Sequence, residues 1–235
     1  MAPAGPEMIR RFPVFSPMAE HSLLVEFDDR IKADVQERVR ALDAGLAASP
    51  FTGFLEAVPA FASLLVRFDP LVTDHGRAEA QLRALLELPL TALRPSTPRE
   101  VEVCYDPAHA PDLAAVAAAT GLTPEAVVAA HLAGDYAVAM YGFAPGYAYL
   151  SGVPEAIRLP RKPAPVRDVP AGSVLIAGQQ CLVSTLTMPT GWWVIGRSPT
   201  RILTETAERP FLFDVGDPVR FRRIGRAEYD AGQGA

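Results

Sequence analysis

The sequence predicts an α+β fold in two domains, a small N-terminal α+β sandwich over residues 1–92 and a β-rich domain over residues 93–235. Three observations support this prediction. Strand-like and helix-like patterns alternate in the first part of the chain, a proline-rich segment follows, and strands then recur between glycine- and proline-rich turns. The length of 235 residues suits two domains of ordinary size.

In the N-terminal domain, apolar runs predict strands at residues 22–27, 56–58 and 63–68. A helix is predicted between the first two strands, because its apolar residues recur near a period of 3.6; they are Ile31, Val35, Val39, Leu42 and Leu46. A second helix is predicted after the third strand, with one apolar face formed by Ala78, Leu82, Leu85 and Leu86. The order strand, helix, strand, strand, helix is typical of a small α+β sandwich.

Residues 89–98 contain three prolines and form the best linker candidate, so we place the domain boundary there. Beyond it, residues 100–105 predict a strand. Two short helices are expected within residues 111–131, and further strands between turns through residue 221.

The two short helices resemble a helix-turn-helix. Gly121 is expected to end the first helix, Thr123 to cap the second and Pro124 to occupy its first position. A DNA-reading role is one interpretation. However, the second helix has no Arg, Lys, Asn or Gln and carries Glu125, which favours the alternative of two helices packed on the β-rich domain.

The overall composition is that of a folded protein with 49% hydrophobic residues and a formal net charge of -5, which argues against a nucleic-acid scaffold. No segment resembles a signal peptide or a membrane span, so we expect a cytoplasmic protein without membrane partners. Cys104 and Cys181 are expected to be reduced core residues.

Several common catalytic and cofactor signatures are absent from the sequence. It contains no P-loop, no G-x-G-x-x-G, no G-x-S-x-G and no paired-histidine metal motif, so we expect no metal. Gly172-Ser173 resembles half of a nucleophile elbow, but Leu175 replaces the second glycine. Ser173 is therefore expected to begin a strand, with its hydroxyl bonded to nearby backbone. A hydrolase that acts alone is disfavoured.

The most informative segments are loop-rich and combine glycine and proline with aromatic residues and arginines; they are residues 141–150, 160–162, 169–174 and 191–199. Together with residues 23–27, 58–66 and 104–113, they resemble the KipI family. This family comprises the small B subunit of bacterial ATP-dependent 5-oxoprolinase and the related allophanate hydrolase subunit 1 of urea amidolyase, a carboxyltransferase C/D-type domain. The resemblance implies that the second domain is a cyclophilin-like β-barrel.

The resemblance also implies an activity. ATP, as a substrate, would phosphorylate the lactam carbonyl oxygen of 5-oxoproline, so that water opens the ring to glutamate. This activity would belong to an assembly with a KipA-type large subunit and a LamB/YcsF-type subunit, and the chain alone would be inactive. Such chemistry needs an anion clamp and groups that stabilise developing negative charge.

Three residues are candidates for catalysis. Arg161 and Arg197 each lie in a turn that matches a family motif, and either clamps an anion or braces loops by bonding backbone carbonyls. His131 falls on the family's matching histidine, where it either relays protons or caps the end of its helix. Lys162 is expected to be solvated rather than catalytic.

The candidates for substrate or anion binding are Gly146, Tyr147, Tyr149, Gly172, Ser173, Gln180 and Trp192. Gly142, Pro145 and Gly146 predict a tight turn, which is either an anion cradle of backbone N–H groups or only a stiff hairpin. Trp192 is expected to lie nearer the site than Trp193, which is expected to be the more exposed.

The chain departs from the family pattern at a presumed site rim. Val166 stands in place of an arginine, with Arg167 and Asp168 beside it, and residues 180–185 lack the usual tyrosine and proline. These changes leave the substrate open, because fold does not fix function. The alternatives are an allophanate hydrolase component, a non-catalytic inhibitor of a sensor histidine kinase and, by fold analogy alone, a prolyl isomerase.

Overall fold

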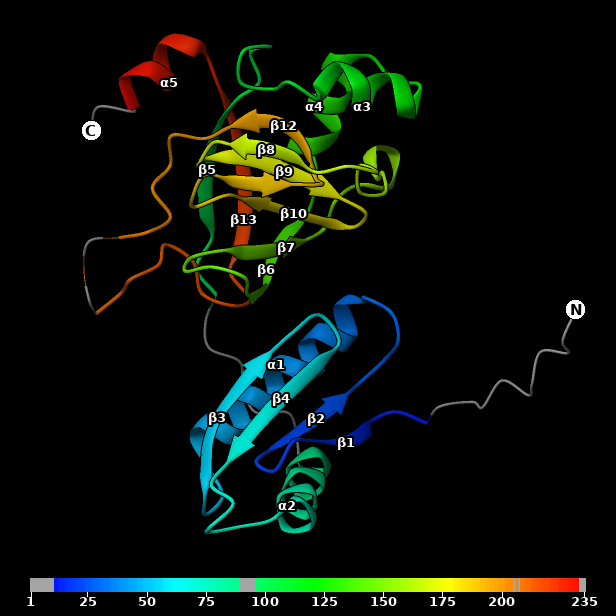
Figure 1. Cartoon of the computed structure of the whole chain (residues 1–235), viewed down its shortest axis with the longest axis vertical. Coiled ribbons are helices and arrows are strands. Elements are labelled where there is room, and N and C mark those ends of the chain that lie inside the picture. Colours follow the sequence, from blue (N-terminus) through cyan, green and yellow to red (C-terminus); the bar gives the residue numbers. More distant parts are fainter. Residues whose placement is uncertain (1–10, 89–95, 205, 207, 233–235) are drawn as a thin grey trace, which may run out of the picture. The chain divides into compact units, whose positions relative to one another are not determined.

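The computed structural model describes residues 11–88, 96–204, 206 and 208–232, and the chain divides into two compact units, residues 1–95 and 96–235 (Figure 1). The predicted boundary between residues 92 and 93 lies outside the described residues.

Unit 1 is a four-stranded antiparallel sheet with two helices (Figure 1). In sheet order, the strands are β1 (Val14–Met18), β2 (Ser22–Glu26), β4 (Ser63–Phe68) and β3 (Phe54–Pro59). The helices are α1 (Ala33–Ala48) and α2 (His75–Glu87). The predicted strands and helices are therefore confirmed, while β1 is an additional strand whose run contains Ser16 and Pro17 and gave no apolar signal.

Alternation along the strands builds the core of unit 1. Leu23 pairs with Val66 and Val25 with Leu64, so these four side chains share one face of the sheet and are fully buried. The apolar stripes of α1 and α2 pack onto that face in the same cluster. Both helices therefore cover one side of the sheet, which makes unit 1 a two-layer sandwich.

Unit 2 is a closed seven-stranded barrel, in the order β10-β7-β6-β13-β5-β12-β9. Its strands in chain order are β5 (Arg99–Cys104), β6 (Tyr136–Tyr141), β7 (Ala148–Ser151), β9 (Ser173–Ala177), β10 (Gln180–Val183), β12 (Trp193–Arg197) and β13 (Pro218–Ile224). Pairing is antiparallel except between β13 and β5, which run parallel. The barrel predicted from the family resemblance is confirmed.

Helical segments and a small second sheet accompany the barrel. Within the described residues of unit 2, the helical segments are α3 (Leu113–Thr120), α4 (Pro124–Leu132), the short helix η1 (Glu155–Ile157) and α5 (Arg226–Gly232). The small sheet pairs β8 (Val166–Val169) with β11 (Met188–Thr190). Within the part of the chain that the structure describes, no single helix has the length and apolar composition that crossing a membrane requires.

The helix pair α3–α4 forms as predicted. Gly121 ends α3 in the left-handed conformation at φ 72°, and the Thr123 hydroxyl accepts a hydrogen bond from the N–H of Ala126. Val127 and Val128 are buried in the barrel's core cluster. The structure therefore shows the packed helix pair, the alternative that we weighed against a DNA reader.

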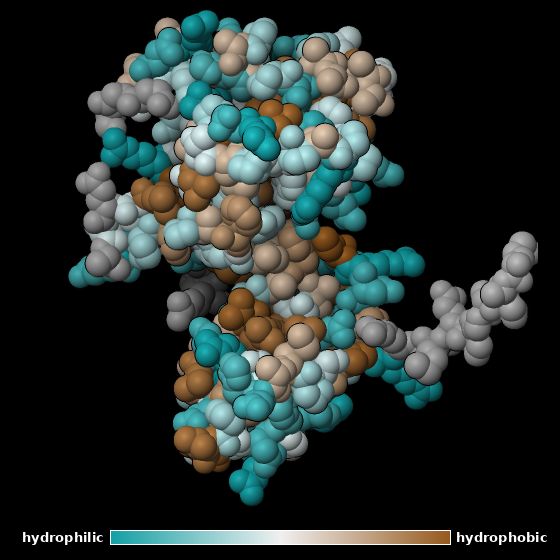
Figure 2. Space-filling view, viewed as in Figure 1, coloured by the Kyte–Doolittle hydropathy of each residue, from teal (hydrophilic) through white to brown (hydrophobic). Residues whose placement is uncertain are grey.

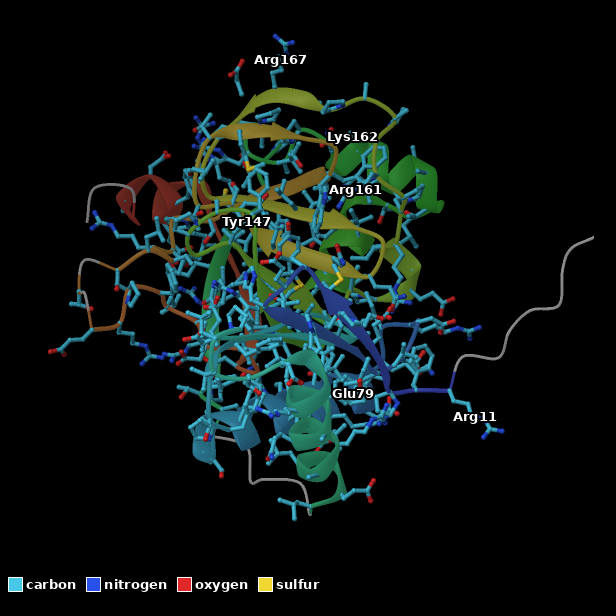
Figure 3. All side chains as sticks on the ribbon, turned by 60° about the horizontal axis from the view of Figure 1, so that its bottom comes forward. Arg11, Glu79, Tyr147, Arg161, Lys162 and Arg167 are labelled. Atoms are coloured by element: carbon cyan, nitrogen blue, oxygen red, sulfur yellow. The ribbon has the colours of Figure 1, made fainter. Side chains whose placement is uncertain are left out.

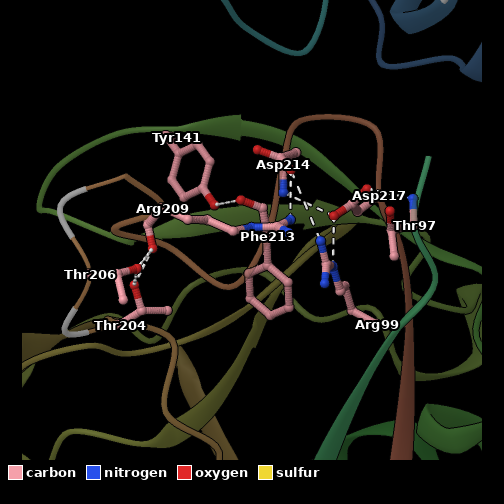
Figure 4. Close-up of polar contacts among 9 residues, drawn as sticks. All are labelled: Thr97, Arg99, Tyr141, Thr204, Thr206, Arg209, Phe213, Asp214 and Asp217. Atoms are coloured by element: carbon pink, nitrogen blue, oxygen red, sulfur yellow. Dashed lines mark hydrogen bonds and ion pairs between the residues drawn. The ribbon is translucent and has the colours of Figure 1, made fainter. Parts of the chain in front are cut away.

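A buried ion-pair network holds the first residues of unit 2 (Figure 4). Asp217, just before β13, has only 3% of its surface exposed. It accepts hydrogen bonds from Thr97 N at 2.8 Å, Arg99 Nε at 2.9 Å and Asp214 N at 3.0 Å. Burial alone would raise the pKa of the Asp217 carboxyl, but these bonds outweigh burial and lower it. The network therefore fixes β5 to the turn before β13.

Candidate functional site

An aromatic row lies on the outer face of the barrel. Leu175 and Ala177 alternate with the core residues Val174 and Ile176, so they point out of the barrel. Three rings join this outer cluster. The ring centroids of Tyr147 and Tyr149 are 5.6 Å apart, and those of Tyr149 and Trp192 are 5.9 Å apart. We call these three rings the aromatic row.

Arg161 completes the aromatic row, because its guanidinium lies 5.7 Å from the centre of the Trp192 ring. Burial, with Tyr149 beside it, raises the pKa of Tyr147 to about 12, and the positive charge of Arg161 lowers it only in part. The Tyr147 phenol is therefore a neutral hydrogen-bonding group near pH 7. The row thus combines apolar surface with one exposed cation.

The loop that carries Arg161 is tied to β12. Lys162 N donates to the carbonyl of Gly191 at 2.7 Å, and the Trp193 indole N–H donates to the carbonyl of Pro160 at 2.7 Å. Figure 3 shows Arg161 and Lys162 on this loop. The predicted difference between the two tryptophans is confirmed, since Trp192 is 5% exposed and Trp193 is half-buried.

Lys162 is not solvated, contrary to our expectation. Its side chain is only 10% exposed, and its Nζ lies 2.7 Å from Asp112 Oδ2. The same carboxylate oxygen accepts the N–H of Val194 at 2.7 Å. Asp112 was missed as a site residue, because its place before a helix predicted only a helix start.

A cavity of about 240 Å³ adjoins this ion pair. Its polar and charged lining residues are His109, Asp112, Lys162, Arg167, Asp168, Ser173 and Arg197. We call it the β8 cavity, because β8 forms one wall. A second, more open cavity of about 280 Å³ is lined by Gly172, Arg197, residues 198–203 and the segment around Ser184. Arg197 is common to both cavities.

Arg197 is braced from one side only. Its Nε donates to the carbonyl of Ala171 at 3.2 Å, and no other hydrogen bond or ion pair holds its guanidinium within the described part of the chain. The sequence left two roles open for Arg197, a brace between loops and an anion clamp. The structure is compatible with both, because Nε bonds to backbone while the terminal nitrogens remain open to a ligand.

The polar groups of Gly172 and Ser173 are used internally. Gly172 N donates to Ser184 O at 2.7 Å, and Ser198 N donates to Gly172 O at 2.8 Å. A side chain at Gly172, which has φ 80°, would meet the carbonyl of Ser198 at 2.5 Å. Ser173 begins β9 and its hydroxyl donates to Pro170 O at 2.7 Å, as predicted. These two residues therefore shape the cavity around Arg197.

The structure separates the candidate residues into two neighbourhoods. Trp192, under Arg161, directly precedes β12 and lies five residues before Arg197, or roughly 16 Å away between Cα atoms in extended backbone. Arg161 and Arg197 therefore do not form a single bidentate clamp. Gln180 shares the outer barrel face with Leu182 and lies with the aromatic row by strand alternation.

The tight turn between β6 and β7 is present as predicted. Gly142 N donates to Tyr147 O, Ala144 N to Gly142 O and Tyr147 N to Ala144 O. Gly146 has φ 70° and is buried against Leu203 and Thr185. Of the three residues of the predicted cradle, Gly142 uses its N–H within the turn and Pro145 has none, so Gly146 is the only one of them whose N–H makes no hydrogen bond in the described part of the chain.

His131 lies in the barrel core and has no exposed surface. Its Nδ1 is 2.7 Å from the Tyr105 hydroxyl and its Nε2 is 3.6 Å from Cys181 Sγ. Burial lowers the pKa of His131 to about 3. At neutral pH it is an uncharged, fully enclosed ring. Its nitrogens contact Tyr105 and Cys181 and not the carbonyls at the end of its helix, so this geometry supports a packing role and favours neither the proton relay nor the helix cap.

Both cysteines are free and buried, as predicted. Over the residues that the structure describes, no group of three or more His, Cys, Asp or Glu side chains is placed to hold a metal ion. The departure from the family pattern at Val166 falls at the β8 cavity, where Arg167 also contributes to the lining. A guanidinium is therefore present at this wall, one residue from the expected position.

Comparison with known proteins identifies a matching family and similar proteins. Residues 13–213 match the model of the carboxyltransferase domain, subdomain C and D. The chain is 35% identical to the 5-oxoprolinase B subunit of Bacillus subtilis (strain 168), over 91% of this chain and 94% of that protein. It is 34% identical to the 5-oxoprolinase B subunit of Escherichia coli O157:H7, over 87% of this chain and 93% of that protein.

Solved structures agree with this result. The crystal structure of TTHA0988 is similar with a TM-score of 0.76 and 36% identity, covering 87% of this chain; our chain spans only 40% of TTHA0988. The urea amidolyase of K. lactis, at 14% identity and a TM-score of 0.73, shows the same fold over 90% of this chain and 15% of its own.

Proposed function

The chain belongs to the family of carboxyltransferase-domain subdomains C and D, the KipI family, and from this premise we propose that it is the small subunit of an ATP-dependent 5-oxoprolinase. The observation that carries the proposal is the match, along nearly their whole length, to two proteins that bear the name of the 5-oxoprolinase B subunit. In the proposed reaction, 5-oxoproline, ATP and water give glutamate, ADP and phosphate.

The proposed reaction requires a partner. The described residues offer anion-binding side chains, but His131, the residue proposed from the sequence for proton transfer, is uncharged and has no exposed surface from which to reach a substrate. We therefore propose that a KipA-type large subunit and a LamB/YcsF-type subunit complete the site and that the assembly, in the cytoplasm, binds ATP. The presence of the fold of this chain within the longer TTHA0988 chain supports an association with further domains.

Two groups of this chain suit the chemistry. Phosphorylation of the lactam oxygen creates negative charge, which guanidinium groups stabilise through charge-assisted hydrogen bonds. Arg197 offers open terminal nitrogens beside two cavities, and Arg161 offers an exposed cation over an aromatic surface. We propose Arg197 as the contact to a phosphate or carboxylate and Arg161, with Tyr149 and Gln180, as a substrate-facing or partner-facing group.

Reconstitution tests this function. The chain is co-purified with its large partner, the third subunit is added, and ATP-dependent glutamate release from 5-oxoproline is measured. We expect release by the wild-type assembly and a loss of roughly a hundredfold in Arg197→Ala. Arg220→Ala is the matched control, because Arg220 is exposed on β13 and lines neither cavity.

Two different results would contradict the proposed function. A stable complex that hydrolyses allophanate but not 5-oxoproline would replace the substrate in this proposal. Failure to form any complex would contradict a subunit role and direct attention to the kinase-inhibitor alternative.

A further inference from the structure

We propose that the β8 cavity is a binding site for a small oxyanion, a carboxylate or a phosphate, held by Arg197 and Arg167 against the fixed Lys162–Asp112 pair. Lys162, Asp112, Arg167 and His109 have no role in the proposed function above. The inference deepens that function and rests on it for the source of the ligand, whereas the site itself is argued from the cavity alone.

The first argument is charge. The cavity is lined by three cations, Lys162, Arg167 and Arg197, and by two carboxylates, Asp112 and Asp168. The formal balance of the lining is therefore +1 with neutral histidine, in a chain whose net charge is -5. A local cationic cavity in an acidic protein attracts anions and raises their local concentration.

The second argument is that two guanidinium groups are unsatisfied. Arg158, Arg161 and Arg220 of unit 2 also lack a carboxylate partner in the described part of the chain, but none of them lines this cavity. Several other arginines are paired: Arg209 with Asp214, Arg222 with Glu100 and Arg223 with Glu125. By contrast, Arg167 has no ion pair or side-chain hydrogen bond in the described part of the chain, and Arg197 has only its Nε bond. Two guanidinium forks without carboxylates at one cavity suit a ligand that brings its own oxygens.

The third argument is preorganisation. Asp112 Oδ2 is held by Val194 N and Lys162 Nζ, both at 2.7 Å, and Asp112 N donates to Val194 O at 3.0 Å. Lys162 is held in turn through its backbone by Gly191. The ammonium group therefore stays at the cavity wall, with its charge balanced, and can donate a further hydrogen bond without rearrangement.

His109 adds a polar group at the same wall. Its ring packs on Tyr229 at 4.3 Å between centroids, and its Nε2 is buried with no hydrogen-bond partner among the described residues. A buried polar atom without a partner costs free energy, but this atom is shielded from solvent, so His109 lines the wall and no ligand contact is assigned to it.

Arg167 is the exposed arm of the proposed site. It lines the cavity yet extends toward solvent from β8 (Figure 3). The face of unit 2 seen in Figure 2 mixes hydrophilic and hydrophobic residues. A long, exposed side chain can fold over a ligand, while Arg197 and Lys162 define the bound position. The cavity volume of about 240 Å³ accommodates a small ligand such as 5-oxoproline, glutamate or inorganic phosphate, but not a whole nucleotide.

Binding to the full chain tests the proposal. Inorganic phosphate, 5-oxoproline and glutamate are titrated separately at low ionic strength by calorimetry. We expect at least one to bind and its affinity to fall roughly tenfold or more in Arg197→Gln and in Arg167→Gln, because each removes a charge-assisted hydrogen bond. Arg220→Gln is the control, since it removes the same charge outside the cavity. Because Arg167 is exposed, we expect Arg167→Gln to fold normally, so a loss of binding in this variant reports on the ligand contact and not on misfolding.

The three probes distinguish which kind of ligand the β8 cavity binds. Binding of phosphate alone assigns the cavity to a phosphoryl group, and binding of 5-oxoproline or glutamate assigns it to a carboxylate. No binding of any probe, or equal losses in all three variants, overturns the site. If a probe binds as expected but the reconstituted assembly releases no glutamate, the proposed function is wrong and the site stands. If the assembly is active but the chain binds no probe, the proposed function stands and the site is wrong.

Discussion

Arg99 and Arg197 are both barrel arginines, but their surroundings are opposite. Arg99 begins β5, its side chain is 15% exposed, and its Nε donates to the buried carboxylate of Asp217 at 2.9 Å (Figure 4). Arg197 ends β12, beside the other end of β5, where it pairs with Cys104 in the strand register. Within the described residues, its guanidinium makes one hydrogen bond, to the carbonyl of Ala171.

This difference separates arginines that stabilise the barrel from arginines that can bind a ligand. A buried guanidinium with a carboxylate partner is part of the folded structure, and removal of either partner leaves an uncompensated charge. A guanidinium beside a cavity with no acid partner contributes little to folding and keeps its hydrogen-bonding capacity for another molecule. The predictions below test this distinction.

The largest effect is expected for Asp217→Asn. The substitution leaves Arg99 buried without its counter-charge, so we expect unit 2 to lose about 3–5 kcal/mol in free energy of unfolding. Urea denaturation of the full chain measures this loss. The control is Asp230→Asn, since that carboxylate is an exposed partner of Arg226 at 3.8 Å and its loss should cost less than about 1 kcal/mol.

The same network predicts a pH dependence. The folded-state pKa of Asp217 is lowered, so its contribution is present above the ordinary aspartate pKa of about 3.9 and is lost as the pH falls from there through the folded pKa. Part of the acid-induced destabilisation of the wild type should therefore be missing in Asp217→Asn. Identical acid profiles would contradict a structural role for the ion pair.

His131 is expected to make a smaller, pH-dependent contribution to the free energy of unfolding. Its folded pKa of about 3 lies below the unfolded value of about 6.5, so the unfolded state takes up the proton first as the pH falls. Stability from the neutral ring is complete above about pH 6.5 and falls by roughly 2 kcal/mol between there and about pH 5. His131→Phe should abolish this component, measured by denaturation at both pH values.

Tyr105→Phe is the control for His131. It removes the hydroxyl that contacts Nδ1 but leaves the histidine buried, so the pH dependence should persist. A wild-type protein whose stability shows no such component would mean that His131 takes up a proton in the folded state, which would restore the proton-relay hypothesis.

The smallest effect on stability is expected for Arg161→Ala. The guanidinium is exposed and contacts Trp192 at 5.7 Å, so its removal should cost about 0.5–1 kcal/mol. Thermal unfolding measures this change. A loss of several kcal/mol would show that Arg161 is a structural brace of the Pro160–Trp193 connection and would remove it from the candidate ligand-binding residues.

Much of the architecture could be predicted from the sequence, because periodicity and turn chemistry are local signals. The 3.6-residue spacing of Val35, Val39 and Leu42 predicted α1, and Gly121 and Thr123 predicted the α3–α4 turn. The prediction of a barrel depended on the family resemblance, because strand order is set by contacts between residues that are distant in sequence, such as Cys104 and Arg197.

The site was predicted less completely, for a physical reason. Sequence reasoning selected residue types in loops, but whether a charge is paired depends on partners far along the chain. Lys162 was expected in solvent and instead meets Asp112, fifty residues away. Arg161 and Lys162 are adjacent in sequence, but Arg161 lies at the aromatic row and Lys162 lines the β8 cavity.

The most direct test of the central claim compares Arg197→Gln with Arg99→Gln in two measurements, free energy of unfolding and ATP-dependent glutamate release by the reconstituted assembly. We predict that Arg99→Gln loses several kcal/mol of stability, whereas Arg197→Gln changes stability by less than about 1 kcal/mol and still loses most of the activity. If Arg197→Gln is as destabilised as Arg99→Gln, or is stable and fully active, Arg197 is a structural residue and the account is contradicted.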